Sequence, residues 1–320
     1  MHLNPIIILI LLITYHKAKH IIRHKGVKYM SHQLKFGVFG GDLRQVYMAE
    51  SFLLQGYPVG TYHIADTVNH KNCFQAHTLN ELFDYSDVLI GPIPMSKDQI
   101  VIVASSTPSD FTIAHVAYLL NEKHILIAGN IPPPIVDLCN SKNIPFFDLM
   151  KNDTIAALNT IATAEGTIME AIASSNRNLQ GSNCLVLGYG RCAKVLARKL
   201  KALEARVTIA ARSTEAIASA CSLGNQGIHL NQLKDTLSSF DYIFNTIPAL
   251  ILDKEYLDLV APSVTMIDIA SAPGGIDFAY AKELKLNAKL CLGLPGKVAP
   301  KTSSDIQVTE ILAFLKERSD

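Results

Sequence analysis

The chain has 320 residues, 49% of them hydrophobic and 18% charged, which is enough apolar material for two buried cores and excludes disordered and fibrous proteins. It has no tryptophan and 7% aromatic residues, so aliphatic side chains must form the cores, as in the buried parallel strands of an α/β fold. Five of the 29 Lys and Arg residues lie in residues 1–33, which contain no acid. The remaining chain is therefore mildly acidic, and nucleic acid is not an expected partner. The six cysteines show neither a CxxC pair nor metal-ligand spacing, so we expect no metal and a reducing, cytoplasmic location.

Residues 1–33 form a leader that we expect to lie outside the fold. Its apolar run, residues 6–13, is too short to cross a membrane as a helix, which takes about 20 residues. Basic residues follow this run, whereas a secretory signal places them before it. Because Met30 directly precedes the first convincing strand, we interpret residues 1–29 as the product of an upstream in-frame start and expect no membrane association.

Residues 34–150 alternate strand-like apolar runs with helical patterns, which predicts a doubly wound parallel sheet. The first run ends in Gly40-Gly41-Asp42 and leads into a helical pattern over residues 43–54. Further strands are expected at 59–64, 88–90, 100–104, 125–128 and 146–147, and helices at 113–120 and 135–141. We predict a flavodoxin-like substrate domain here, completed by a C-terminal helix at residues 302–318.

A long helix is expected between two domains, at residues 151–178, because the segment is rich in Ala, Ile and Met and poor in charge. Glu165 lies inside its apolar part. A carboxylate on such a helix must be paired, protonated or in contact with solvent, since burying it alone costs too much free energy. A catalytic role and a structural role for Glu165 are both open.

Residues 179–301 carry the pattern of a Rossmann domain. A short apolar strand precedes the sequence Gly188-Tyr189-Gly190-Arg191-Cys192-Ala193, and a helical run and a second strand follow it. The first glycine permits a tight turn, the second lets the backbone approach a pyrophosphate, and Ala193 permits close helix–strand packing. This order of elements predicts a dinucleotide site that includes Tyr189 and Arg191, although a surface role for Arg191 is equally open.

The end of the second strand of this domain indicates the type of cofactor. Enzymes that use NAD place an acidic residue there to bind the ribose 2′-hydroxyl, but this strand ends in Arg212, Ser213 and Thr214. A cation with two hydroxyl groups suits a 2′-phosphate instead, so NADP(H) is the predicted cofactor.

Three later loops follow strand-like runs and are expected at the same edge of the sheet, where open α/β sheets bind ligands. Thr246 and Pro248 follow the first run and are predicted to border the nicotinamide-side ribose. The segment after a strand at 264–269 contains Ser271, and the segment after an expected strand at 292–294 contains Lys297 and Lys301.

Taken in order, these motifs resemble the family of dipicolinate synthase A subunits, and the similarity covers residue 34 to the C-terminus. The segments that carry it are Gly40-Gly41-Asp42 with Arg44-Gln45, Glu165-Gly166-Thr167, Gly188-Tyr189-Gly190-Arg191, Ala211-Arg212-Ser213, Asn245-Thr246-Ile247-Pro248, Pro273-Gly274-Gly275 and Leu294-Pro295-Gly296. The chain departs from the family pattern at Ala162, at Ala272 and in the leader.

The resemblance implies an NADP-linked oxidation of a cyclic dicarboxylate, derived from 4-hydroxy-tetrahydrodipicolinate, to dipicolinate in the mother cell of a sporulating bacterium. It also implies a partner, the flavoprotein-like B subunit of dipicolinate synthase, and we expect a homo-oligomer as well. The substrate-binding residues expected on this basis are Arg44, Ser271 and Lys301, and the catalytic ones are Asp42, Glu165 and Lys297. A solvated surface charge or a helix cap is the alternative for each charged residue.

Two other functions stay open. The 2-hydroxyacid dehydrogenases have a similar architecture, but they use an Arg beside the Ser271-Ala272 loop and a His after the proline equivalent to Pro295. This chain has Ala272 and Gly296 instead, which argues against that chemistry. The second alternative is a non-catalytic, NADP(H)-binding scaffold for the flavoprotein, because the glycine pattern indicates binding and not turnover.

Overall fold

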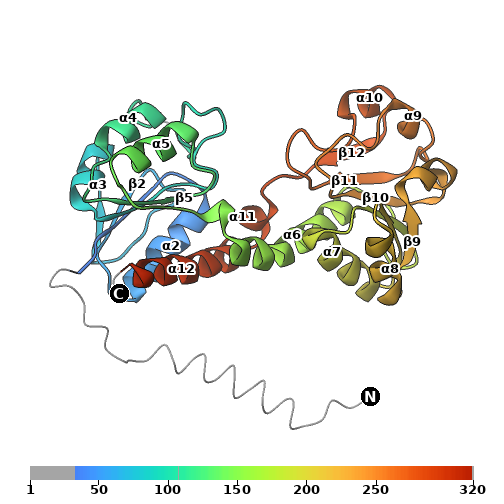
Figure 1. Cartoon of the computed structure of the whole chain (residues 1–320), viewed down its shortest axis with the longest axis horizontal. Helices are drawn as coiled ribbons and strands as arrows, with labels where there is room; N and C mark the ends of the chain where they lie inside the picture. Colours follow the sequence, from blue (N-terminus) through green and yellow to red (C-terminus); the bar gives the residue numbers. More distant parts are fainter. Residues whose placement is uncertain (1–32, 107, 319–320) are drawn as a thin grey trace, which may run out of the picture. The chain divides into compact units, whose positions relative to one another are not determined.

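The computed structural model describes residues 33–106 and 108–318. The expectations for the leader, including a start at Met30, fall on residues 1–32 and lie outside the described part. Within that part, the strands form two six-stranded sheets, each parallel throughout and flanked by helices (Figure 1). This confirms the predicted fold class of two doubly wound α/β domains joined by a long helix. No described helix is both long and apolar enough to cross a membrane.

The first sheet has the strand order β3-β2-β1-β4-β5-β6. Its strands are β1 (Phe36–Phe39), β2 (Val59–Tyr62), β3 (Cys73–Gln75), β4 (Val88–Ile90), β5 (Ile125–Ala128) and β6 (Phe146–Asp148). Without the short edge strand β3, this is the order of flavodoxin-like sheets. Phe36 of β1 is in register with Val59 on one side and Val88 on the other, so the carboxyl ends of β1, β2 and β4 meet at one edge.

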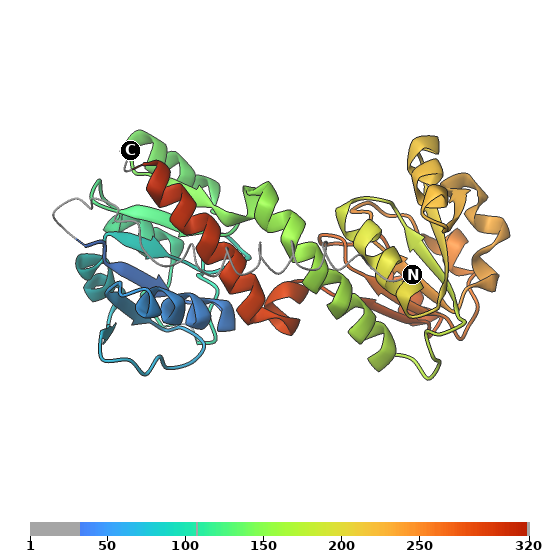
Figure 2. The ribbon, with the colours of Figure 1, turned by 90° about the horizontal axis from the view of Figure 1, so that it is seen from below.

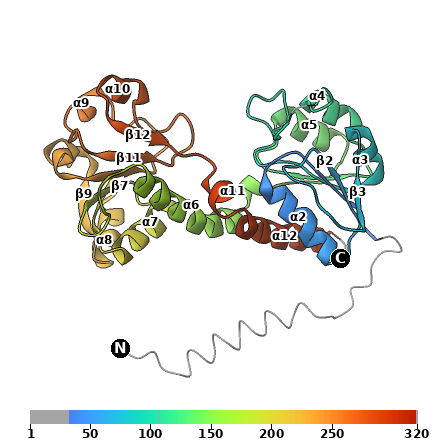
Figure 3. The ribbon, with the colours of Figure 1, turned by 180° about the vertical axis from the view of Figure 1, so that it is seen from behind.

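Polar caps and prolines start the helices of this domain. They are α2 (Leu43–Leu54) with Asp42 as N-cap, α3 (Leu79–Tyr85) with Thr78, α4 (Ile113–Leu119) with Thr112, and α5 (Pro133–Ser141) with proline in its first turn. Helices α3, α4 and α5 bury their apolar faces in one cluster on the sheet (Figure 3). The strand expected at 100–104 is wrong, because this segment makes only isolated antiparallel bridges and its amides bond to the flanking loops.

The second sheet has the order β12-β11-β10-β7-β8-β9, which is the Rossmann arrangement. Its strands are β7 (Asn183–Leu187), β8 (Arg206–Ala211), β9 (Gln226–His229), β10 (Tyr242–Asn245), β11 (Thr265–Asp268) and β12 (Asn287–Leu290). The strand expected at 292–294 is therefore wrong. The edge strand comes earlier, where alternate residues are exposed and the apolar run is broken, and Leu294 begins a helix.

Helices cover both faces of this sheet, with α7 and α8 on one side and α9 and α10 on the other (Figure 3). Their bounds are α7 (Arg191–Ala202), α8 (Thr214–Ser222), α9 (Lys254–Leu257) and α10 (Phe278–Glu283). Short 3₁₀ helices occur at η1 (Leu149–Lys151), η2 (Leu230–Asp235) and η3 (Leu237–Ser239).

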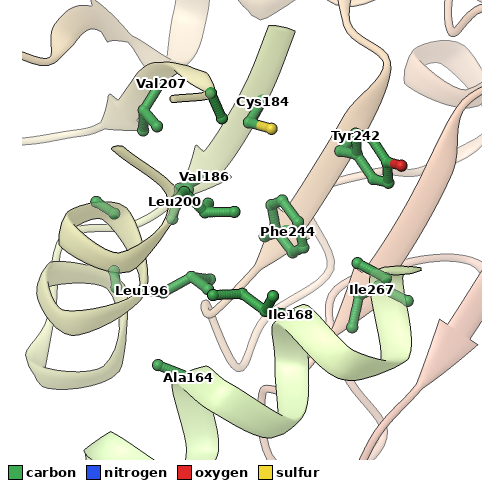
Figure 4. Close-up of a cluster of buried hydrophobic side chains, with 14 of the residues drawn as sticks. Ala164, Ile168, Cys184, Val186, Leu196, Leu200, Val207, Tyr242, Phe244 and Ile267 are labelled. Carbon is green, nitrogen blue, oxygen red and sulfur yellow. The ribbon is translucent and has the colours of Figure 1, made fainter. Parts of the chain in front are cut away.

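The long helix α6 (Asp153–Ala173) follows the first domain and packs against α7. Its residues Ala164 and Ile168 share a cluster with Leu196 of α7 and with Val186 and Phe244 of the second sheet (Figure 4). One stripe of the helix is not covered by described residues, since four of its apolar side chains are 44–54% exposed, namely Leu158, Ile161, Met169 and Ile172. The helix is thus not buried all round, because this apolar stripe is exposed.

The chain then returns through α11 (Leu294–Val298) and α12 (Pro300–Glu317). Helix α12 packs along α2 and also contacts α6 (Figure 2). Helix α11 approaches α6 closely at Gly166, where an added Cβ would lie 3.1 Å from Cβ of Leu294. The domain boundaries expected from the sequence stay a prediction.

Candidate functional site

The glycine-rich loop connects β7 to the N-terminus of α7. Gly188 has φ +93°, and an added Cβ would lie 2.7 Å from Oγ1 of Thr246, so the turn requires glycine. Gly190 is the N-cap of α7 and supplies no side-chain cap, and a Cβ there would meet no atom within 4 Å. The N-terminus of α7 is therefore not crowded at Gly190, which leaves room there for the pyrophosphate of a dinucleotide.

Two side chains beside this loop have partners within the protein. Tyr189 is buried, which raises the pKa of its hydroxyl, and its ring lies 5.4 Å from Nζ of Lys194. Arg191, at the start of α7, forms a 2.8 Å ion pair with Asp153 at the start of α6, and both side chains are exposed. Its predicted contact with a phosphate would have to compete with this ion pair.

The segment after β8 presents the residues predicted to select the cofactor. Arg212, Ser213 and Thr214 are all exposed. Ser213 caps α8 by accepting a 3.3 Å hydrogen bond from the amide of Ala216, which leaves its hydroxyl proton free to donate. The side chain of Arg212 makes no hydrogen bond or ion pair with any residue that the structure describes. A guanidinium group with no partner among the described residues therefore lies beside the carboxyl end of β8.

The turn after β10 is attached directly to the strand that precedes the glycine loop. The backbone amide and the hydroxyl of Thr246 both donate to the carbonyl of Leu187, at 3.1 and 2.8 Å. Thr246 therefore lies against Gly188, and Pro248 is exposed at the end of the turn. Their role in cofactor binding stays a prediction.

The loop after β11 carries the exposed Ser271 and is tied to Asp268, a residue that sequence reasoning missed. Asp268 and Asn245 are fully buried and hydrogen-bonded to each other at 2.9 Å. The signal that could have identified them is a polar residue at the last position of an otherwise apolar strand.

Asp42 and Arg44 form a compact pair at the carboxyl end of β1. Nε and Nη2 of Arg44 donate to the two oxygens of Asp42 at 2.9 and 2.8 Å, and Nη2 also donates to the carbonyl of Ile93 at 2.6 Å. The Arg44 side chain is 9% exposed and the Asp42 side chain 46%. Nη1 of Arg44 has no partner among the described residues, yet it is not sealed from solvent. This nitrogen is free to bind an anion.

The pair is in contact with helix α11. A Cβ added to Gly296 would lie 2.8 Å from both Nε of Arg44 and Oδ2 of Asp42. The predicted residues Asp42 and Arg44 are thus brought together with the helix that carries Lys297, whose side chain is exposed. The role of Gly296 could not be identified from the sequence, because it depends on a contact between the two ends of the chain.

Other predicted site residues have charged partners elsewhere. Glu165 forms a 2.8 Å ion pair with Lys199 of α7, and its side chain is 55% exposed. Lys301 pairs with Asp305, one turn further along α12. Neither residue forms an ion pair with the Asp42–Arg44 pair, and their roles at the site stay predictions. Within the described residues, no group of three or more His, Cys, Asp or Glu side chains is suited to hold a metal ion.

Comparisons with known proteins identify the family of the chain. Residues 35–150 match the N-terminal domain of the dipicolinate synthase A subunit, and residues 154–274 match the NAD-binding domain of D-isomer specific 2-hydroxyacid dehydrogenases. The chain is 31% identical to the dipicolinate synthase A subunit of Bacillus subtilis over 89% of its own length and 96% of that relative. The chain belongs to the family of dipicolinate synthase A subunits.

Solved structures of this family have the same fold. The protein from Bacillus halodurans superposes with a TM-score of 0.81 at 28% identity, over 90% of this chain and 99% of that one. Its counterpart from Bacillus subtilis gives 0.78 at 29% identity, over 91% and 98%. The dehydrogenase-type domain supports a nicotinamide dinucleotide as the cofactor and an oxidoreductase-like role for this member of the dipicolinate synthase family.

Proposed function

We propose that this chain is a dipicolinate synthase subunit that oxidises a cyclic 2,6-dicarboxylate with NADP⁺. The substrate is a dihydrodipicolinate, formed from 4-hydroxy-tetrahydrodipicolinate by loss of water, and the product is dipicolinate. The oxidation removes one hydride and one proton from the ring, and the aromaticity of the product drives it. Family membership supports the substrate class, and the match to an NAD-binding domain supports the type of oxidant.

The observation that carries this proposal is the fixed guanidinium of Arg44. Asp42 and the Ile93 carbonyl hold two of its nitrogens, so the third is presented with little loss of side-chain entropy when it binds a carboxylate. A dicarboxylate needs a second anchor, for which the exposed Ser271 hydroxyl and Lys301 are the candidates.

The cofactor half of the site uses the glycine loop. Gly188 and Gly190 leave the α7 amides open to a pyrophosphate, and Arg212, Ser213 and Thr214 would bind a 2′-phosphate. Tyr189, Arg191, Thr246 and Pro248 complete the proposed cofactor contacts. When bound, the nicotinamide supplies the hydride acceptor.

Proton removal from the ring requires a base, and three candidates follow from the sequence. Both oxygens of Asp42 accept hydrogen bonds from Arg44, so this carboxylate holds the guanidinium group in place. Lys297 is exposed on α11 beside this pair, and Glu165 is held by Lys199. We assign Asp42 a part in holding Arg44 and keep Asp42, Lys297 and Glu165 as candidates for proton transfer, to be separated by the pH dependence of turnover.

One alternative chemistry is disfavoured by a specific contact. The 2-hydroxyacid dehydrogenases place a His where this chain has Gly296, and any side chain there would overlap Arg44 and Asp42. The other alternative is a non-catalytic NADP(H)-binding scaffold for the flavoprotein-like B subunit. We propose that this flavoprotein is a partner, that the chain also self-associates, and that both act in the mother-cell cytoplasm.

The test is to supply the purified chain with the product of dihydrodipicolinate synthase and NADP⁺, with and without the flavoprotein partner, and to follow dipicolinate by its ultraviolet absorbance. Formation that requires this chain, and that falls severely in Arg44→Met, supports the proposal. If the partner alone makes dipicolinate at the full rate, this chain is a scaffold and not the enzyme.

A further inference from the structure

Asp268, the last residue of β11, is a fully buried carboxylate, and the described structure pairs it with no cation. Hydrogen bonds satisfy it instead. Oδ1 accepts from Nδ2 of Asn245 and from the amide of Ala270, both at 2.9 Å, and Oδ2 accepts from the amide of Gly275 at 2.7 Å. Its two oxygens therefore hold both ends of the loop that carries Ser271, since Ala270 begins that loop and Gly275 closes it.

Asn245, the last residue of β10, extends this network toward the glycine loop. Its Nδ2 also donates to the carbonyl of Ile247 at 3.0 Å, and its Oδ1 accepts from the amide of Ile247 at 3.1 Å. The turn that contains Thr246 is thereby fixed, and Thr246 in turn contacts Gly188. A continuous chain of contacts leads from the proposed pyrophosphate loop to the Ser271 loop.

Two glycines show how closely the loop fits Asp268. Gly274 has φ +89°, and an added Cβ would lie 2.6 Å from Oδ2 of Asp268. A Cβ on Gly275 would lie 2.5 Å from Nδ2 of Asn245. The loop can follow this path only with glycine at both positions, so the network and the loop conformation depend on each other.

We propose that Asp268 is a positioning residue that holds the Ser271 loop and the Thr246 turn against the nicotinamide half of the cofactor. The inference rests on the function proposed above, and it assigns the task to a group that never touches cofactor or substrate. Arg212, which is proposed to bind the 2′-phosphate at the adenosine end, follows β8 and is not a member of this network. Loss of the Gly275 contact should therefore loosen the nicotinamide and slow hydride transfer while the adenosine half still binds.

The experiment compares the full-length wild type with Asp268→Asn, which loses one acceptor oxygen and presents an amide N–H to the Gly275 N–H. Asp277→Asn is the matched control, because it makes the same chemical change in an N-cap of α10 that an asparagine can replace. We measure the affinity for 2′,5′-ADP by calorimetry, the fluorescence anisotropy of bound NADPH, and kcat and KM for dipicolinate formation. Asp268→Asn should keep its 2′,5′-ADP affinity within about twofold, lower the NADPH anisotropy and reduce kcat at least about tenfold, whereas the control should resemble wild type.

Gly274→Ala provides the second variant if Asp268→Asn does not fold, because it disturbs the same contact from the loop side and leaves the buried pair intact. It should shift anisotropy and kcat in the same direction. The inference is overturned if the folded variant keeps kcat and anisotropy, or if 2′,5′-ADP binding falls in parallel with turnover. A wild type that neither binds NADPH nor forms dipicolinate would overturn the proposed function itself, and this inference with it.

Discussion

Nε of Arg44 lies 2.8 Å from the point where a Cβ on residue 296 would stand. Arg44 cannot move aside easily, because Asp42 and the carbonyl of Ile93 both hold its guanidinium and its side chain is buried. The absence of a side chain at Gly296 is therefore what allows α11 to approach the carboxyl end of β1. The proposed carboxylate anchor and the helix that carries Lys297 depend on this one contact.

Gly296→Ala should disturb both the fold and the proposed anchor. The added methyl group must displace Arg44 or push α11 away, and overpacking of this kind costs about 1–3 kcal/mol. We expect a lower melting temperature and a fall in kcat/KM for dipicolinate formation of at least about tenfold, with most of the change in KM. Val298→Ala, a small change on the same helix, is the control. A stable Gly296→Ala protein with unchanged KM would show that Arg44 does not bind substrate.

Gly190→Ala should weaken cofactor binding without lowering the stability of the fold. Its φ of −81° is allowed for any residue and the Cβ would meet no atom of the described residues within 4 Å, so the melting temperature without cofactor should not fall. A pyrophosphate bound at the α7 amides would collide with the methyl group, and the NADPH dissociation constant should rise at least about tenfold. Unchanged NADPH affinity, measured by calorimetry, would remove the pyrophosphate from this loop.

Cofactor choice should depend on Arg212. Replacement by Asp removes a guanidinium that has no partner among the described residues and adds the acid that favours a free ribose hydroxyl. A charge-assisted contact to a phosphate is worth about 1.5–3 kcal/mol, so the NADP(H) dissociation constant should rise about 10- to 150-fold. The NAD(H) constant should stay within about threefold or fall. An equal loss for both cofactors would contradict the assignment of Arg212.

The sequence predicted those parts of the site that are local in the chain. The glycine loop, its strand and its helix follow one another directly, and Asp42 caps the helix that carries Arg44, so each could be identified from spacing. Strand periodicity failed at residues 100–104, where tertiary contacts turn an apolar run into a loop, and at β12, an edge strand with polar residues on its exposed side.

Contacts between distant segments could not be predicted. The role of Gly296 follows only from the contact of α11 with Arg44. The role of Asp268 follows only from its hydrogen bonds to Asn245, Ala270 and Gly275. The environment of Glu165 could not be predicted from the sequence either. Its neighbours on α6 indicate a buried position, but the partner that settles its environment, Lys199, lies on another helix.

Tyr62 should make stability sensitive to alkaline pH. Burial, followed by its hydrogen bond to Asp110, raises the pKa of Tyr62 to about 12, above its ordinary value of 10.0. The folded state therefore favours the protonated phenol, and this stabilisation is complete below pH 10 and is lost as the pH rises toward 12. Tyr62→Phe should cost about 1–3 kcal/mol at pH 8, because Asp110 loses a donor. In urea titrations, the difference between wild type and variant should shrink from pH 10 to pH 12, and a difference that is constant with pH would contradict the shifted pKa.

Variants of the ion pair between Glu165 and Lys199 can distinguish a catalytic role of Glu165 from a role in joining α6 to α7. Both side chains are partly exposed, at 55% and 27%, so the pair should contribute only about 0.2–1 kcal/mol to stability. If the pair only joins α6 to α7, Glu165→Gln and Lys199→Met should each lower the melting temperature slightly, the double variant should lower it no further, and all three should retain turnover. The geometry of the pair makes this the expected result, since both charged groups have their partner within the protein. A loss of kcat of at least about 100-fold in Glu165→Gln, with Lys199→Met active and the acidic limb of the pH profile removed, would instead identify Glu165 as the base.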